Sequence, residues 1–422
     1  MIAGAHHTSH RGLIELSAPA EGTAAVDAIL VPSARPAAAL AEAGRLAAAL
    51  GCVLLVLCSK HSEASKAFAF LTRRQPDLDV VAVDFPEGGV ERLPPLQTST
   101  VLGRSRLMRR TDTSAKRNLG LVLARLAGWK RVVFLDDDIR VPDATDLARA
   151  ASLLDTRDGV GLHIGGFPDN SVVCHANRET GASQDTFIGG GALAVPADRM
   201  DSFFPEIYNE DWFFLLGETM LRRVGQVGVA LQKSYDPFAS PDRARGEEFG
   251  DVLAEGLFAL FDDGRRIGDA DLDYWTMFLA ARLEFIEAIR GRIEHKVGPI
   301  SPHEKHMLES LAASCGRLQF IWPETCVAYV EAWQRDRERW RRFMNGVRPI
   351  RSAANGRATI DVAADRLGLR AYHSGGSGVA PASAGAISAT TATTGTSASR
   401  VAPRPKLRAK PPMANGPKML AL

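Results

Sequence analysis

The sequence predicts an α/β fold in which a largely parallel sheet is flanked by helices. Short apolar segments alternate with stretches of helical periodicity over roughly the first 235 residues. One of these segments ends in three consecutive aspartates, Asp136 to Asp138. A buried strand that ends in carboxylates is typical of the carboxyl edge of such a sheet, where ligands bind. Further along, helical periodicity replaces the strands and predicts a helical C-terminal subdomain.

Composition sets limits on the class of protein. The 422 residues correspond to two or three domains, and a hydrophobic content of 45% is enough for a sizeable core. A net charge of +2 argues against a nucleic-acid binder. Five scattered cysteines without CxxC spacing favour reduced thiols in a cytoplasmic protein over a zinc site. We see no signal peptide and no apolar run approaching about 18 residues, so no membrane span is expected.

The first elements alternate as strand, helix, strand, helix and strand, which predicts right-handed βαβ units. A polar loop with several Gly and Pro residues should follow over 86–112. The five predicted elements are a strand at 28–36 that is stopped by Pro32, a helix at 37–50, a strand at 52–58, a helix at 62–74 and a strand at 79–84.

A firmer helix ends at Ala127 before Gly128, with Asp112, Thr113 or Ser114 as its N-cap. The Asp-bearing strand at 131–135 and a helix at 144–155 follow. The next stretch is rich in glycine and in strand-like sequence, with strands expected at 159–166, 171–175, 187–195 and 227–231. The triple glycine Gly189, Gly190 and Gly191 should lie inside the third of these strands. Glycine in a strand marks a close approach of ligand or backbone.

Four long helices are expected after these strands, at 245–262, 271–293, 302–316 and 322–345. The predicted organisation is a flexible leader at 1–25, a catalytic domain at 26–240, a helical subdomain at 241–350, and a mostly disordered basic tail at 351–422. The leader carries His6, His7 and His10, for which we favour a plain terminus over a metal site. The tail has no acidic residue after Asp365, and weak peripheral contact of this tail with a membrane is an alternative to mere solvation.

The three aspartates point to a metal. Carboxylates at one sheet edge repel one another unless a cation joins them, and Mg²⁺ or Mn²⁺ is the cation that prefers oxygen ligands. Such ions keep open positions for phosphates, so we expect a metal–diphosphate site. The alternative is a solvated cluster that caps the next helix. Glu210 and Asp211 offer a similar choice between a helix N-terminus and a general base in a cleft.

The order of these motifs resembles the glycosyltransferase family 2-like proteins with the GT-A fold, over roughly residues 26–235. The matching segments are Val31-Pro32-Ser33, Lys116-Arg117-Asn118-x-Gly120, Phe134-Leu-Asp-Asp-Asp138, Gly189-Gly-Gly-Ala192, and Glu210-Asp211 with Arg222 and Gly225 behind it.

The resemblance implies a donor site for a nucleoside-diphosphate sugar. Asp136 and Asp138 match the DxD pair that holds Mn²⁺ or Mg²⁺ on the diphosphate, and Asp137 is expected to reach the ribose or to brace the turn. The other residues implied in donor binding are Pro32, Ser33 and Arg35 on the nucleoside and Arg117 and Asn118 near the nucleotide.

The resemblance also implies an acceptor site. Asp211 would remove the proton from an acceptor hydroxyl as this attacks the anomeric carbon, in a single displacement with inversion, and Glu210 would support it. Gly189 to Gly191 and Trp212 would border the sugar and the acceptor. The acceptor is unnamed by this pattern.

Two departures from the family matter. Cys58-Ser59-Lys60 stands where the family commonly has an acidic residue for the base, so UDP and GDP both stay open, with Asp84 as a substitute. The QxxRW motif of processive synthases is missing: Gln334 to Arg337 is followed by Glu338. A soluble or small acceptor is therefore expected.

Three other classes of protein compete with this interpretation. A sugar-nucleotide nucleotidyltransferase would need glycines after the first strand, and Pro32 to Pro36 has none. A phosphohydrolase with a DxD nucleophile would want Thr or Val where Arg140 stands. A non-catalytic relative that binds a nucleotide would be favoured if the Asp cluster held no metal.

Overall fold

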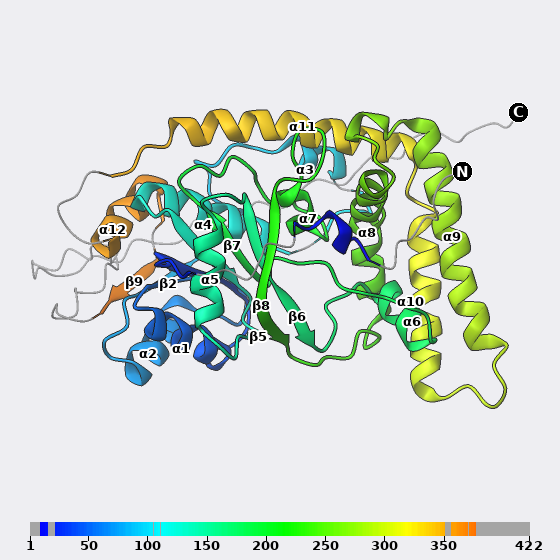
Figure 1. Cartoon of the computed structure of the whole chain (residues 1–422), viewed down its shortest axis with the longest axis horizontal. Coiled ribbons are helices and arrows are strands. Elements are labelled where there is room, and N and C mark those ends of the chain that lie inside the picture. The colour runs from blue at the N-terminus through cyan, green and yellow to red at the C-terminus, as the bar shows by residue number, and fades with distance from the viewer. Residues whose placement is uncertain are drawn as a thin grey trace, which may run out of the picture. The chain divides into compact units, whose positions relative to one another are not determined.

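The computed structural model describes residues 9–15, 22–103, 105–109, 111–350, 356–369 and 371–376. Within these residues, nine strands form one sheet in the order β5-β8-β6-β7-β4-β1-β2-β3-β9 (Figure 1). The strands are β1 Ala28–Ser33, β2 Val53–Cys58, β3 Val80–Asp84, β4 Arg131–Leu135, β5 Ile139–Arg140, β6 Gly159–Gly166, β7 Ala192–Pro196, β8 Val224–Gln232 and β9 Tyr372–Gly375.

The sheet is mixed, which corrects the prediction of a largely parallel one. β1–β2, β2–β3, β1–β4 and β6–β8 are parallel, whereas β4–β7, β6–β7, β3–β9 and β5–β8 are antiparallel. The parallel part is the βαβ region that the first strands predicted. β7 enters between β4 and β6 in the opposite direction, so the carboxyl end of β4 meets the residues that lead into β7.

Helices cover both faces of the sheet. They are α1 Ala41–Leu50, α2 Ala64–Arg74, α3 Gln97–Leu102, α4 Thr113–Ala127, α5 Thr145–Leu153, α6 Val172–Glu179, α7 Glu210–Leu215, α8 Pro241–Asp262, α9 Leu272–Glu294, α10 Pro302–Leu318, α11 Pro323–Gly346 and α12 Gly356–Leu367. The 3₁₀ turns are η1 Arg11–Leu13, η2 Ala37–Leu40 and η3 Ile267–Asp269. No helix among the described residues is long and apolar enough to cross a membrane.

Successive side chains of a strand point to opposite faces of the sheet, and they therefore divide the core into two clusters. In β1, Leu30 belongs to the cluster shared with α4 and α8–α11, whereas Ile29 and Val31 belong to the cluster beneath α1, α2 and α5. A strand covered on both faces reads as a continuous apolar run, as β1, β2 and β4 do. In Figure 1, α8, α9 and α10 gather at one end of the sheet and α11 runs along it.

Several predicted boundaries are wrong. β1 continues through Pro32, which the sequence suggested would stop it; β4 pairs only with Ala28 to Leu30, so the missing N–H of Pro32 interrupts no ladder there. The predicted strand at 171–175 is the start of α6, whose Ser171 caps the N–H of Cys174. The glycines at 189–191 precede β7 rather than lie inside it.

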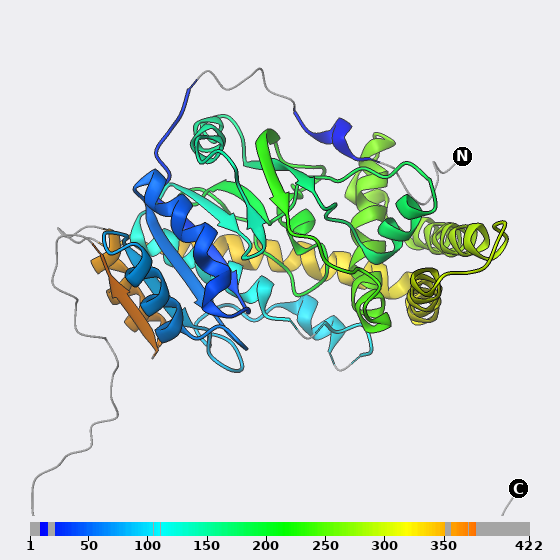
Figure 2. The ribbon, with the colours of Figure 1, turned by 90° about the horizontal axis from the view of Figure 1, so that it is seen from below.

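Ordered structure also occurs in segments predicted to lack it. The loop at 86–112 contains α3, whose first N–H groups are bound by Asp336. The predicted tail from 351 contains α12 and β9, and β9 pairs with β3, next to α2 (Figure 2). Residues 9–15 of the predicted leader pack against α8 through His10. His6, His7 and the basic stretch after residue 376 lie outside the described residues.

Candidate active site

Backbone hydrogen bonds place the three aspartates directly beside the triple glycine. Asp136 to Asp138 form the turn after β4, and the Asp136 N–H donates to the Gly191 carbonyl at 3.0 Å. The Ile139 N–H donates back to the Asp136 carbonyl at 3.2 Å, which closes the turn. Because β4 and β7 are antiparallel neighbours, the end of one strand and the beginning of the other share this edge.

Arg117 of α4 joins the strand-end cluster to the start of α7. Its guanidinium is 3% exposed and donates to both carboxylate oxygens of Asp136, at 2.8 and 3.0 Å, and to Glu210 at 2.9 Å. Burial alone would lower the pKa of Arg117, but the charges of Asp136 and Glu210 outweigh it and raise that pKa. Two predicted regions that are far apart in the sequence therefore share one buried cation.

The triple glycine leaves room for these charged groups. A Cβ atom at Gly190 would lie 2.4 Å from Nη1 of Arg117, and a Cβ at Gly189 would lie 3.0 Å from Oδ2 of Asp211. The Gly190 N–H donates to Oδ2 of Asp211 at 2.5 Å, while Oδ1 accepts from the Trp212 N–H at 2.9 Å. Close approach of backbone to side chains, rather than positive φ, explains glycine at these positions.

Arg35 and Ser33 hold the other two aspartates. The Ser33 hydroxyl donates to Asp137 at 2.8 Å, and Arg35 donates to both Asp137 and Asp138, at 2.8 Å to the latter. Gln232 of β8 also donates to Asp138, at 3.1 Å. Burial and the neighbouring charge of Asp136 raise the pKa of Asp138 despite Arg35. Negative charge is thus in excess at this edge.

Two charged residues near this edge were not predicted as site residues. Burial in the cleft, followed by the charges of Asp211 and Asp136, raises the pKa of Asp169 to about 7. The side chain of Asp169 is exposed to the cavity described below. Lys116 is buried and donates to the Ser33 carbonyl at 2.8 Å and to Ser59 at 2.6 Å. Burial lowers the pKa of Lys116.

Two predicted residues, Asn118 and Pro32, have structural contacts instead of an open position, whereas a third, Trp212, packs on α8 and also lines the cavity beside Asp211. Asn118 donates to the Phe204 carbonyl and accepts from the Phe204 N–H, both at 2.8 Å, so both ends of its amide are engaged. Trp212 packs on Phe258 with ring centroids 4.4 Å apart. Pro32 is a member of β1.

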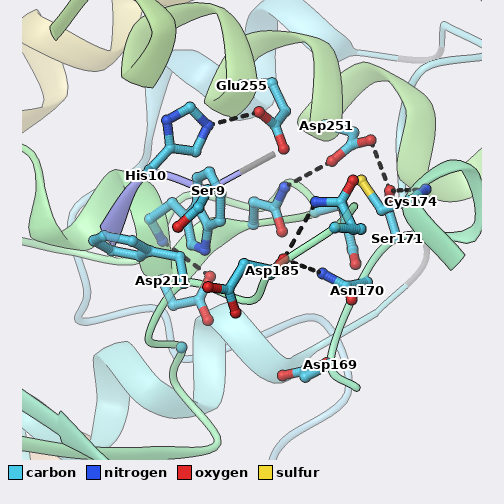
Figure 3. Close-up of a pocket in the computed structure, with 16 residues that line it drawn as sticks. Ser9, His10, Asp169, Asn170, Ser171, Cys174, Asp185, Asp211, Asp251 and Glu255 are labelled. Atoms are coloured by element: carbon cyan, nitrogen blue, oxygen red, sulfur yellow. Dashed lines mark hydrogen bonds and ion pairs between the residues drawn. The ribbon is translucent and has the colours of Figure 1, made fainter. Parts of the chain in front are cut away.

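A cavity of about 50 Å³ opens beside Asp211 (Figure 3). Asp169 and Gly189 also line it, and α8 adds Asp251 and Glu255. In this view Asp169 and Asp211 lie on one side and His10 and Glu255 on the other. His10 pairs with Glu255 at 2.7 Å and with Asp262 at 2.5 Å, and it contacts the edge of Trp212. The N-terminal segment and the helical subdomain therefore both help to form this cavity.

The carboxylate oxygens of the cluster are suitable ligands for a divalent cation. Carboxylate oxygens are the ligands that Mg²⁺ and Mn²⁺ prefer. Burial, and after it the charges of neighbouring carboxylates, raise the pKa values of Asp138 and Asp169, and a cation would offset those charges. In their present arrangement, no three His, Cys, Asp or Glu side chains of the described residues are grouped closely enough to hold a metal. Binding would thus require Arg35 or Arg117 to release a carboxylate.

Comparison with known proteins identifies no family. No family model matches the chain, and no curated protein matches it. Among solved structures, it is similar to the mannosyltransferase PcManGT from Pyrobaculum calidifontis in complex with GDP-Man and Mn²⁺, with a TM-score of 0.39 and 14% identity. That similarity covers 84% of this chain and 90% of the other. At this TM-score and identity, the likeness establishes neither family nor activity.

Proposed function

We propose that the chain is a glycosyltransferase of the family 2-like, GT-A type, which transfers a sugar from a nucleoside-diphosphate sugar to an acceptor hydroxyl with inversion. The observation that carries this proposal is the Arg117 bridge, which connects Asp136 to Glu210 and so joins the predicted donor and acceptor regions. A solvated Asp cluster that merely caps a helix would not need a buried guanidinium shared with a distant acidic pair.

At the donor end, Asp136 and Asp138 would hold Mn²⁺ or Mg²⁺, which when bound supplies positive charge to the leaving diphosphate. Arg35 pairs with Asp137 and Asp138 and is exposed, so its guanidinium can turn to phosphate oxygens once a carboxylate is taken up. Ser33 keeps Asp137 in place next to β1.

At the acceptor end, Asp211 would take the proton of the attacking hydroxyl. The hydroxyl oxygen forms a bond to the anomeric carbon as the bond from that carbon to the diphosphate breaks, and the electron pair leaves with the nucleoside diphosphate. Two backbone N–H groups fix the Asp211 carboxylate beside the cavity. Such fixation supports a base that must be oriented before the acceptor arrives.

The proposed catalytic domain spans residues 26–240, with the helical subdomain at 241–350. α8 of that subdomain lines the cavity, so we assign it a share in acceptor binding. The five cysteines are buried free thiols, which supports the proposed cytoplasmic location.

One observation favours a second candidate, a non-catalytic nucleotide-binding relative. Arg35 and Arg117 already pair with all three aspartates, so the cluster is partly neutralised by the chain itself. If these pairs were too stable to open, a nucleotide could bind without metal and without transfer. A sugar-nucleotide nucleotidyltransferase has no comparable support.

Donor binding decides between these candidates. The protein should be titrated calorimetrically with a panel of UDP- and GDP-sugars, with Mn²⁺ and with EDTA, while donor hydrolysis is followed. The proposal expects one donor to bind more tightly with metal than without and to be consumed slowly. Metal-independent binding without consumption would support the non-catalytic candidate, and no binding of any donor would refute both.

A further inference from the structure

The turn between α10 and α11 carries two exposed aromatic side chains. All eighteen phenylalanines and six tryptophans lie among the described residues. Only Phe320, at 45%, and Trp322, at 63%, are exposed; the others are buried or half-buried. Single exposed apolar residues need no explanation, but here two exposed aromatic residues share one turn.

An arginine-lined groove of about 580 Å³ borders this turn. Arg106, Arg245 and Arg317 line it together with Phe320, and the Arg106 guanidinium lies 4.8 Å from the centre of the Phe320 ring. Arg317 also donates to the Arg106 carbonyl. The arginines come from three separate parts of the chain, so the fold itself brings these charges together.

Positive charge in the groove is only partly offset. Burial lowers the pKa of Arg317, and the charges of Arg245 and Arg106 lower it further. The Arg317 Nε has no hydrogen-bond partner among the described residues. Two carboxylates oppose these charges: Glu309 lines the groove, and Asp242 pairs with Arg245 at 2.6 Å. A small positive excess remains among the described residues of the groove.

The loop at 105–109 connects this groove to the candidate active site. Arg106 lies in the groove, and Met108 is 46% exposed. Arg109 approaches Glu210 to 3.9 Å and lies over the Tyr208 ring at 5.1 Å. Whatever binds at the groove is therefore one short loop away from the acidic pair of α7.

We propose that Arg106, Met108, Arg245, Arg317, Phe320 and Trp322 form a surface that docks on anionic phospholipid membranes. Tryptophan and phenylalanine side chains bind at the level of the lipid headgroups, and arginine side chains bind the phosphates of those headgroups. The modest charge excess favours this partner over nucleic acid, which recruits larger basic surfaces. Contact is peripheral, and it does not depend on the proposed transferase activity or on the basic tail.

Vesicle binding by the full chain tests the proposal. The protein is sedimented with phosphatidylcholine vesicles and with vesicles that also contain phosphatidylglycerol. We expect binding to the anionic vesicles only, weakened about tenfold or more both by the double variant R106E/R245E and by F320S/W322S. Trp322 reports directly: tryptophan emission should shift to the blue on binding, and much less so in W322F.

Matched controls use exposed residues on other surfaces. R73E/K130E reverses the same number of charges, and M277S removes an exposed apolar side chain from α9; both should bind vesicles like the unmodified chain. Wild-type affinity in the groove variants, equal binding to both kinds of vesicle, or no vesicle binding at all would overturn the proposal. Displacement of bound vesicles by inorganic phosphate at low concentration would likewise overturn it, in favour of a site for a free anion.

Discussion

At the scale of single residues, the geometry of the cleft depends on how closely the backbone approaches Arg117. The guanidinium occupies the space that a side chain at position 190 would need, and it pairs with Asp136 and Glu210 at the same time. Removing one partner from a buried ion pair costs more than the pair itself contributes, because the remaining charge stays buried.

Gly190→Ala should therefore be strongly destabilising. The new methyl group would overlap the Arg117 guanidinium and separate it from its carboxylates, with an expected loss of about 3–5 kcal/mol in the free energy of unfolding. Gly246→Ala in α8 is the control, because a Cβ there meets nothing within 4 Å. It should stabilise the chain by about 0.5–1 kcal/mol. Urea denaturation measures both, and equal stability of the two variants would contradict the assigned contact.

Substitutions at Asp138 and Asp211 should separate the donor end from the acceptor end. Asp138→Ala should abolish the part of donor binding that depends on metal, because it removes a proposed ligand. Asp211→Asn keeps the shape of the side chain, so donor binding should persist while transfer slows by about 10²–10⁴-fold. Calorimetry and initial rates measure the two effects. Equal loss of donor binding in both variants would show that the roles are wrongly divided.

The candidate site residues that could be predicted from the sequence are those that directly follow a strand. Asp136 to Asp138 stand out because an apolar run leads directly into them, and the same rule points to Asp169 after β6, although the Gly-rich context hid it. Lys116 could not be found in this way, because α4 is buried on nearly all sides and its sequence does not reveal which residue faces which element. The double hydrogen bond of Asn118 to Phe204 has the same cause.

At the scale of elements, α3 depends on one carboxylate from α11. Asp336 is fully buried and accepts from the Gln97 N–H at 2.8 Å, the Thr98 N–H at 2.8 Å and the Thr98 hydroxyl at 2.9 Å. A short helix of this kind has little stability of its own, because nucleation is unfavourable. Its position is thus imposed by a helix more than two hundred residues away.

Asp336→Ala should detach α3 without disturbing the sheet. Leaving the two N–H groups and the Thr98 hydroxyl without their acceptor costs about 1–3 kcal/mol for each group, so we expect a loss of at least about 3 kcal/mol. Hydrogen exchange should rise in residues 97–102 and stay unchanged in β1 and β2. Asp336→Asn keeps one acceptor oxygen and should have an intermediate effect. Unchanged exchange in α3 would show that packing alone holds it.

The errors in the predicted elements have tertiary causes. Val172 and Val173 favour a strand by local preference, yet Glu247 of α8 accepts the Val172 N–H at 2.9 Å and Asp251 accepts the Ser171 hydroxyl at 2.8 Å. These contacts from α8 favour α6 in a way that no local pattern could reveal. Elements with long, regular periodicity, such as α4 and α9, needed no such support and were predicted within a few residues.

At the scale of the whole molecule, two buried histidines should give stability opposite dependences on pH. Burial alone would lower the pKa of His10, but the charge of Glu255 and a hydrogen bond to Asp262 outweigh it and raise the pKa to about 9. Burial and the charge of Arg243 lower the pKa of His175 to about 4. Each shift corresponds to about 3 kcal/mol of stability in the pH range where the histidine has its favoured charge.

The direction of each pH dependence follows from whether the folded or the unfolded chain binds the histidine proton more tightly. The folded chain holds the His10 proton more tightly, so this contribution is full below about pH 6.5 and is lost as the pH rises to about 9. For His175 the unfolded chain holds the proton more tightly, so its contribution is full above about pH 6.5 and is lost as the pH falls toward 4. In a denaturation series, His10→Gln should remove the alkaline slope and His175→Gln the acidic one. An unchanged slope in either variant would refute its assignment.

The pairing of β3 with β9 also bears on when the fold can be completed. About 290 residues separate the two strands, and β9 covers an edge of β3 that is otherwise open. During synthesis, β3 cannot pair with β9 along that edge until nearly the whole described chain has left the ribosome. An uncovered strand edge is a template for pairing with other chains. Production of this protein should therefore be sensitive to the speed of translation and to chaperones, and shortened versions should keep residues 372–375.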